Sequence, residues 1–463
     1  MKNNKNALIL GAGLTGLRTA LYLINSGFNV TIIEKTDKVG GVCASFKYKD
    51  FILDYGPHKF YTQLPGVYED FKSLVPNYLT IKKKNSIRLL GQYFDFPVKL
   101  SQLLMRIPLS KAFNIFIDFV KSNLSRNEIK NYEDYFVKGF GRTGYNTIFK
   151  GFAEKVWGNP QKLSKELAIK RSPVGNIFDV LKSMLIKNKD VSAEFFYYPK
   201  IGYGEIGENI AKQITKKGGK ILFNSYAKKI NLKEDNVESL EVSIKGKIKK
   251  LKADVLVSSI PITDLPGLLF PKTPNNILDS ASKLKFRSMI ISYVFLKKEK
   301  ALNDNWIFFP EREFFFNRVA ELKSFSPFVS PKDRTVLTAE ITCDYNDEIY
   351  NLPEEKIKEK VLKDLEKANL IKKDEVIDFI TRKAGRVYPV YSLDSKENLN
   401  KVLDFLDKIG NIYTTGRPGL FNYNNADHCL DMAKVVSDII IKQKPRSEWK
   451  KARDYFDSYR IVD

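Results

Sequence analysis

The pattern of apolar and polar positions in the first 35 residues predicts a strand, a helix and a second strand. Residues 7–10 are an apolar run, which is typical of a buried parallel strand. Residues 17–26 carry apolar side chains at helical spacing and are followed by Gly27, where a helix commonly ends. Residues 29–33 predict the second strand, which ends at Glu34.

The turn between the first strand and the helix reads Gly11-Ala12-Gly13-Leu14-Thr15-Gly16. Gly11 permits the tight turn, Gly13 lets the backbone approach a pyrophosphate, and Gly16 lets the helix pack closely on the strand. The helix N-terminus offers free N–H groups and a positive dipole end to the phosphates, and we expect Leu14 and Thr15 to contact the cofactor. Glu34, 18 residues beyond Gly16, is placed to accept hydrogen bonds from a ribose diol. This unit predicts a dinucleotide site, because a glycine turn without a ligand would leave Glu34 unexplained.

A glycine pair follows six residues after Glu34, in Lys35-Thr36-Asp37-Lys38-Val39-Gly40-Gly41. This pattern resembles the FAD-binding unit of the superfamily of amine oxidases, protoporphyrinogen oxidases and UDP-galactopyranose mutases, and it is unusual in NAD dehydrogenases. Residues 219–226 and 252–261 are similar to strands of the same FAD domain. The resemblance implies that FAD is the cofactor and that Lys35, Gly40, Gly41, Tyr226 and Ser259 contact it.

The resemblance also implies an α/β fold. A Rossmann-like FAD-binding domain of the glutathione-reductase type would be interleaved with a mixed α+β substrate domain. We expect the FAD-binding domain over residues 1–75, 195–265 and 376–463 and the substrate domain over 76–194 and 266–375.

Four further segments resemble the mutase branch: residues 54–60, 148–174, 305–319 and 415–428, with residues 386–390 upstream of the last. In that branch the first and last segments lie along the flavin, which implies cofactor contacts at Gly56, Pro57, His58, Gly416, Arg417 and Tyr423. The second and third line the substrate pocket, which implies Trp157 beside the nucleotide base and Arg171 and Arg318 on the diphosphate. Tyr388 and Tyr423 would be hydrogen-bond partners of the substrate.

The chain departs from the mutase pattern at four places. Gly175 stands where a second arginine is usual, Asn317 replaces one tyrosine and Asn424 replaces another. Pro57 also replaces the usual alanine or glycine. The missing arginine at Gly175 and the missing tyrosine at Asn424 favour a rival function, or a mutase-like enzyme with a different sugar.

The mutase resemblance implies covalent catalysis by the cofactor in cell-surface polysaccharide synthesis. Reduced FAD would attack the anomeric carbon of a nucleotide-linked sugar, and the ring would open and reclose at another size. His58 and Arg417 would act on the flavin as catalytic residues. The rival is an oxidoreductase of the protoporphyrinogen oxidase or amine oxidase type, acting on an apolar or amine substrate. A non-enzymatic FAD-binding protein is a third alternative.

Simpler structural roles stand beside these site roles. His58 and His428 could be hydrogen-bonded packing residues. Trp157 could belong to the core, and for Trp306, which lies in a phenylalanine-rich stretch, we expect core packing. Four arginines could be surface residues or ion-paired: Arg171, Arg318, Arg386 and Arg417.

Composition adds few constraints. The net charge of +23 favours anionic partners, but the lysines are scattered, and no nucleic-acid module is recognised. Three separated cysteines argue against a disulfide framework or a metal site and agree with the cytoplasm. We expect no signal peptide and no membrane span; residues 101–124 predict an amphipathic helix whose apolar face packs on the core, although contact with a membrane surface stays open. A reductant such as NAD(P)H is an expected partner, and the oligomeric state is not indicated.

Overall fold

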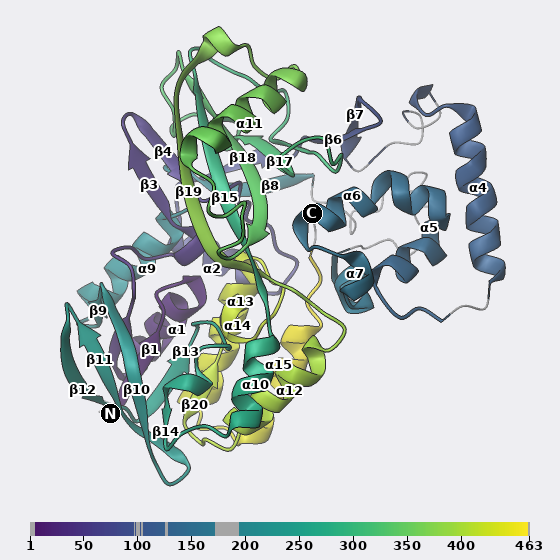
Figure 1. The fold of residues 1–463 in the computed structure, drawn as a ribbon. Coiled ribbons are helices and arrows are strands. Elements are labelled where there is room, and N and C mark those ends of the chain that lie inside the picture. Colours follow the sequence, from purple (N-terminus) through teal and green to yellow (C-terminus); the bar gives the residue numbers. More distant parts are fainter. Residues whose placement is uncertain are drawn as a thin grey trace.

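A parallel five-stranded sheet organises the nucleotide-binding part of the computed structural model (Figure 1). The structure describes residues 5–96, 98, 102, 105–125, 128–171 and 194–461; Gly175 lies outside them. The strand order is β20-β13-β1-β2-β9, with β1 and β2 adjacent. The strands are β1 (Asn6–Leu10), β2 (Asn29–Ile33), β9 (Lys220–Leu222), β13 (Val255–Ser258) and β20 (Ile412–Thr414).

Three helices pack together beside this sheet, and their apolar faces form its core. Helix α1 (Leu14–Asn25) contacts both α9 (Glu205–Lys216) and α14 (Ala426–Ile441). Leu17 of α1, Ile210 of α9 and Val436 of α14 are fully buried in one cluster. Segments from opposite ends of the chain therefore meet around the glycine turn.

A second, seven-stranded sheet has the order β19-β15-β18-β17-β16-β6-β7. Its long central strand β15 is buried at every position, because helix α11 (Glu354–Lys367) and other elements cover its faces (Figure 1). The strands are β6 (Asn85–Leu89), β7 (Gln92–Phe96), β15 (Phe286–Leu296), β16 (Trp306–Phe308), β17 (Arg318–Glu321), β18 (Thr335–Asp344) and β19 (Val376–Pro389).

The remaining strands form a mixed sheet, β12-β11-β10-β14, in which β14 runs parallel to β10, and two antiparallel pairs, β3-β4 and β5-β8. These strands are β3 (Ser45–Tyr48), β4 (Phe51–Asp54), β5 (Tyr78–Lys82), β8 (Phe195–Pro199), β10 (Ser225–Lys233), β11 (Asn236–Ile244), β12 (Lys247–Lys252) and β14 (Leu269–Phe270). Four further helices are α2 (Val67–Leu74), α10 (Asn275–Lys283), α12 (Ser395–Leu406) and α15 (Arg446–Asp457). The division into two domains stays a proposal. Strand β19 pairs with β15 in the seven-stranded sheet, so we propose that the last FAD-binding segment begins near residue 390 and not at 376.

A helical region lies to one side of both sheets: α4 (Leu109–Leu124), α5 (Tyr132–Ile148), α6 (Lys150–Val156) and α7 (Lys165–Arg171) (Figure 1). The expectation that the apolar face of residues 101–124 packs on the core is wrong for α4. Leu109 and Phe113 are exposed, whereas Asp118 is bonded to α5. The rotation of α4 is set by polar contacts to α5. Among the described residues, no helix has the length and hydropathy needed to cross a bilayer.

Candidate flavin and substrate site

The glycine turn after β1 leaves open space on one side only. Gly11 has φ +95°, and a Cβ there would lie 2.6 Å from Ser259 Oγ. A Cβ on Gly16 would lie 2.2 Å from the carbonyl oxygen of Gly11, so the helix start is pressed against the strand end. A Cβ on Gly13 would meet nothing within 4 Å. The turn thus fits a pyrophosphate at Gly13 and the N-terminus of α1.

The second glycine pair lies beside the first turn. Gly40 donates its N–H to Ala12 O at 2.8 Å and bridges to Gly13. Gly40 and Gly41 have φ values of +98° and +58°, which glycine adopts without strain. Two loops separated by a strand and a helix therefore form one backbone surface around Gly13.

Glu34 is held close to the same turn. Its carboxylate accepts hydrogen bonds from Ala12 N at 2.7 Å, Thr36 N at 2.8 Å and Thr36 Oγ1 at 2.7 Å. Ser225 N donates to the Glu34 carbonyl at 2.8 Å, which brings the exposed ring of Tyr226 to this edge. Lys35 is exposed. A ribose diol on Glu34 and an adenine beside Tyr226 stay predictions.

His58 is half-buried, and its surroundings favour the neutral imidazole. Its Nδ1 lies 3.0 Å from Gly56 O, and its ring stacks on Tyr203 with centroids 5.0 Å apart. Burial, with the charges of Arg417 and Arg318, lowers the pKa of His58 to about 3. Because the carbonyl can only accept, Nδ1 carries the proton and Nε2 presents a lone pair. Gly56 has φ +91°, and half-buried Pro57 follows it.

Arg417 is a cation held by carbonyl groups. Its guanidinium donates to Asn424 O at 2.6 and 3.1 Å and to Val387 O at 3.2 Å. No carboxylate among the described residues pairs with it, so its charge stays uncompensated within that part of the chain. Gly416, with φ +78°, would place a Cβ 3.1 Å from Thr15 Oγ1. The backbone next to Arg417 therefore lies close to Thr15 in the first turn of α1.

An aromatic and cationic stack joins four of the predicted substrate residues. Trp157 Nε1 donates to Tyr423 OH at 2.9 Å, and the rings of Tyr423 and Tyr388 stack 5.4 Å apart at 5°. The Arg171 guanidinium lies 5.4 Å from the Tyr423 ring centroid and 5.9 Å from that of Trp157. The Arg417 guanidinium lies 5.5 Å from the Tyr388 ring centroid, on the far side of the cluster from Trp157 along this chain of contacts. Trp157 itself is buried in a core cluster, so pocket lining by its indole stays a prediction.

Arg318 forms a bidentate ion pair with Glu340, a partner that the sequence did not indicate. Its Nε and Nη2 lie 2.5 and 2.8 Å from the two carboxylate oxygens of Glu340. Glu340 is buried, and a Cβ on Gly56 would lie 2.4 Å from its Oε1. The arginine is therefore fixed next to the segment that carries His58. A carboxylate within the apolar strand at residues 335–344 was the available signal.

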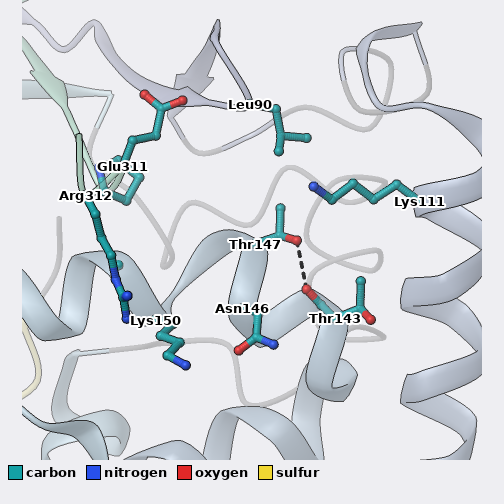
Figure 2. A pocket seen from close by; sticks show the side chains of 10 residues that line it. Leu90, Lys111, Thr143, Asn146, Thr147, Lys150, Glu311 and Arg312 are labelled. Carbon is teal, nitrogen blue, oxygen red and sulfur yellow. Dashed lines mark hydrogen bonds between the residues drawn. The ribbon is translucent and has the colours of Figure 1, made fainter. Parts of the chain in front are cut away.

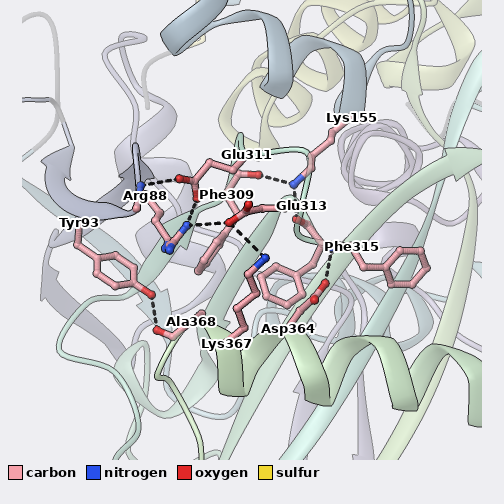
Figure 3. A network of polar contacts seen from close by, with 12 residues as sticks. Arg88, Tyr93, Lys155, Phe309, Glu311, Glu313, Phe315, Asp364, Lys367 and Ala368 are labelled. Atoms are coloured by element: carbon pink, nitrogen blue, oxygen red, sulfur yellow. Dashed lines mark hydrogen bonds and ion pairs between the residues drawn. The ribbon is translucent and has the colours of Figure 1, made fainter. Parts of the chain in front are cut away.

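Lys155 ties the Trp157 segment to the Arg318 segment (Figure 3). Its Nζ donates to the carbonyl oxygens of Phe309 at 2.8 Å and Phe316 at 3.0 Å. Burial lowers the pKa of Lys155 to about 7, against the opposing field of nearby carboxylates. Sequence analysis missed this residue, although it lies in one of the quoted segments.

The carboxylate of Asp54, four residues before His58, is buried and accepts three hydrogen bonds. Its carboxylate accepts from Ser45 Oγ at 2.5 Å, from Tyr203 N at 3.0 Å and from the Tyr198 hydroxyl. Burial outweighs these bonds and raises the pKa of Asp54 to about 6. Since Tyr203 stacks on His58, the hydrogen bond from Tyr203 N links Asp54 to the residue that supports that imidazole.

The Asp54 carboxyl should make stability depend on pH. Its folded-state pKa lies above its unfolded value, so its contribution is fully present below pH 4 and is lost as pH rises through about 6. In Asp54→Asn this loss disappears, and the free energy of unfolding relative to wild type should rise by about 3 kcal/mol between pH 4 and pH 7. Urea titrations at these pH values measure it. Asp279→Asn, which changes an exposed carboxyl on α10, is the control; equal slopes in wild type and Asp54→Asn would contradict the prediction.

Two of the simpler roles fit the structure. Trp306 is buried against Phe196 and Phe325, which confirms the expected core packing. His428 accepts from Asn425 N at 3.1 Å in the first turn of α14 and stacks on Tyr459. It caps a helix at the rim of a small cavity of about 170 Å³.

A larger cavity lies away from the predicted site. It has a volume of about 560 Å³ between α4, α5 and residues 310–312, and Figure 2 shows Lys111 reaching across it toward Leu90 and Thr147. None of the predicted site residues lines this cavity.

The fold and the glycine site together define a dinucleotide-binding flavoprotein of the α/β class. The chain belongs to the family described as flavin containing amine oxidoreductase, whose profile matches residues 14–385. This confirms the superfamily resemblance and the flavin cofactor, FAD.

Individual relatives show two chemistries. The chain is 29% identical to a probable UDP-galactopyranose mutase of Klebsiella pneumoniae over 45% of its length and 53% of the relative's. It is 28% identical to a 15-cis-phytoene desaturase of Solanum lycopersicum, over 57% and 48% of the two chains. The chain thus spans about half the length of the curated relatives it matches.

Solved structures support the fold. A crystal structure of reduced UDP-galactopyranose mutase superposes with a TM-score of 0.84 at 18% identity, covering 99% of this chain and 98% of the other. A putative protoporphyrinogen oxidase from Exiguobacterium gives a TM-score of 0.74 at 16% identity, over 96% of this chain and 100% of the other. These likenesses confirm the predicted fold class.

Proposed function

We propose that the chain is an FAD-dependent mutase that changes the ring size of a nucleotide-linked sugar, of the UDP-sugar class. The observation that carries the proposal is the cluster of Trp157, Tyr423, Tyr388 and two arginines, one of which follows Gly416 near the first turn of α1. Aromatic faces suit a nucleotide base, and guanidinium groups suit a diphosphate. Reduced FAD, when bound, supplies the nucleophile for the anomeric carbon.

The chain's own residues would bind, orient and polarise. Arg171 lies at the end of the stack, where its charge would hold the diphosphate. Arg318 would add a fixed cation, its orientation set by Glu340. Arg417, whose charge is not matched by a described carboxylate, would stabilise negative charge on the flavin pyrimidine. His58 would offer an acceptor at Nε2.

A flavin oxidoreductase acting on an apolar substrate is the second candidate. Glu340 neutralises Arg318, which weakens the case for a diphosphate site there. The phytoene desaturase relatives match over more of this chain than the mutases do. In this alternative the same aromatic stack would line an apolar pocket.

Other partners follow from the same proposal. A mutase needs a reductant to prepare its flavin, and NAD(P)H is the class we propose. The cysteines are unpaired, in keeping with the cytoplasmic location that we propose. Nucleic acid is not a proposed partner.

Binding of UDP should quench the tryptophan fluorescence of the oxidised holoprotein. We expect saturable quenching below about 1 mM UDP, because a stacked base alters the environment of Trp157. Trp157→Phe should lose most of the quench. Trp306→Phe is the matched control, since its Nε1 has no hydrogen-bond partner among the described residues.

Turnover separates the two candidates. A mutase should isomerise a UDP-sugar only with reduced flavin and with no net oxidant. An oxidoreductase should instead be reduced by its substrate and reoxidised by oxygen or a quinone. Failure to bind UDP at about 1 mM would remove the mutase proposal.

A further inference from the structure

Helix α4 presents an apolar stripe to solvent. Leu109, Phe113, Phe116 and Leu124 are 82%, 64%, 57% and 79% exposed, and Val120 lies between the last two. Their spacing of three or four residues puts all five on one side of the helix. The stripe extends for about 23 Å. Figure 1 places α4 at the edge of the molecule, beyond α5 and away from the parallel sheet.

Contacts on the opposite side fix the rotation of this helix. Asp118 accepts from Thr143 N at 3.0 Å and from the Thr143 hydroxyl, and Phe119 is buried. Gly141 of α5, with φ +73°, comes so close that a Cβ there would lie 2.5 Å from Phe119 N. One face of the helix, with Asp118 and Phe119, therefore packs toward α5, and the stripe of Leu109, Phe113, Phe116, Val120 and Leu124 faces out.

The end of α4 is anchored as well. Lys138 of α5 donates to the carbonyl oxygens of Ser122, Asn123 and Ser125 at 2.9, 3.1 and 2.6 Å. A lysine that satisfies three carbonyl groups at a helix C-terminus holds that end in place. The exposed stripe is thus a fixed surface of the described structure.

The charge of the protein favours an anionic lipid surface, and not a second copy of the chain, as the partner of this stripe. Arg106 and Lys121 are exposed near the two ends of the stripe, whereas Asp118 is turned inward. Each chain carries +23, so two copies brought together would repel, while anionic lipid would be attracted. A lysine-bearing helix with phenylalanine and leucine on one face is typical of segments that lie in a membrane interface. At 16 residues α4 is too short to span a bilayer.

We propose that the outer face of α4 docks the protein on an anionic bilayer surface, with Phe113 and Phe116 in the acyl boundary and Lys121 among the headgroups. The docking face is distinct from the aromatic and arginine site. It would hold the enzyme at the membrane without occupying its substrate pocket.

Vesicle co-sedimentation of the full-length holoprotein tests the proposal. We expect binding to phosphatidylcholine vesicles that contain about 30% phosphatidylglycerol, and much weaker binding to pure phosphatidylcholine. Phe113→Ser/Phe116→Ser should lower the partition coefficient at least about tenfold, with the flavin spectrum unchanged. Phe328→Ser, which removes an aromatic ring of 52% exposure outside α4, should bind like wild type.

A charge variant gives an independent reading. Lys121→Glu should weaken binding to the anionic vesicles only, and added salt should reproduce its effect on wild type. Equal binding of wild type and the double phenylalanine variant, or no binding by wild type, would overturn the proposal. Sedimentation velocity tests whether a second copy binds this face instead. If the wild type is a dimer and Phe113→Ser/Phe116→Ser is a monomer, the face belongs to a dimer interface and the membrane proposal is overturned.

Discussion

Gly13→Val protein should fold normally and be isolated without FAD. Gly13 precedes α1 with φ −70° and ψ 170°, a conformation that valine adopts readily, and no atom lies within 4 Å of its would-be Cβ. The new side chain would occupy the space where backbone N–H groups approach the pyrophosphate. We expect the FAD affinity to fall at least about 100-fold, or about 3 kcal/mol. Flavin absorbance after gel filtration and an FAD titration of the apoprotein measure this.

Two other glycines give the controls. Gly267 also has open space around its would-be Cβ but lies away from the turn, so Gly267→Val should keep its FAD. Gly16→Val should fail to fold, because its Cβ would collide with Gly11 O. Wild-type FAD affinity in Gly13→Val would mean that the cofactor does not pass this residue.

The nucleotide-binding unit is predictable because its signals are local. The predicted second strand, residues 29–33, coincides with β2. The predicted first strand, residues 7–10, lacks only the first residue of β1, which begins at Asn6. The helix begins at Leu14, earlier than its apolar spacing indicated, because the glycine turn itself enters the first helical turn. Buried parallel strands and glycine turns depend on few distant contacts.

The seven-stranded sheet could not be predicted in this way. Strand β6 pairs with β16, which is far away along the chain, and β15 lies between β18 and β19. Such pairings depend on the whole topology, so only the family resemblance suggested a mixed substrate domain. Likewise, the spacing in residues 101–124 predicts an amphipathic helix but not its rotation, which Asp118 and Lys138 determine.

The candidate site shows the same division. Motif matching selected Arg318, Arg417 and His58, and the structure brings them close enough for both arginines to lower the pKa of the histidine. It could not select Glu340 or Lys155, because their partners come from other elements. A buried charge in a strand requires a partner, and the identity of that partner is a tertiary property.

The Arg318–Glu340 pair should give the largest stability effect in the site. Arg318→Met leaves the buried carboxylate of Glu340 without its bidentate partner, and we expect a loss of about 3–5 kcal/mol in the free energy of unfolding. Urea denaturation of the holoprotein measures it. A loss below about 1 kcal/mol would mean that the pair contributes little to the fold.

The double variant Arg318→Met/Glu340→Gln separates folding from substrate binding. Since the amide that replaces the carboxylate carries no charge, the double variant should recover most of the lost stability. If Arg318 also holds a diphosphate, UDP affinity should stay low in the double variant although its fold is restored. Recovery of stability together with wild-type UDP affinity would limit Arg318 to a structural role and leave Arg171 as the diphosphate ligand to test.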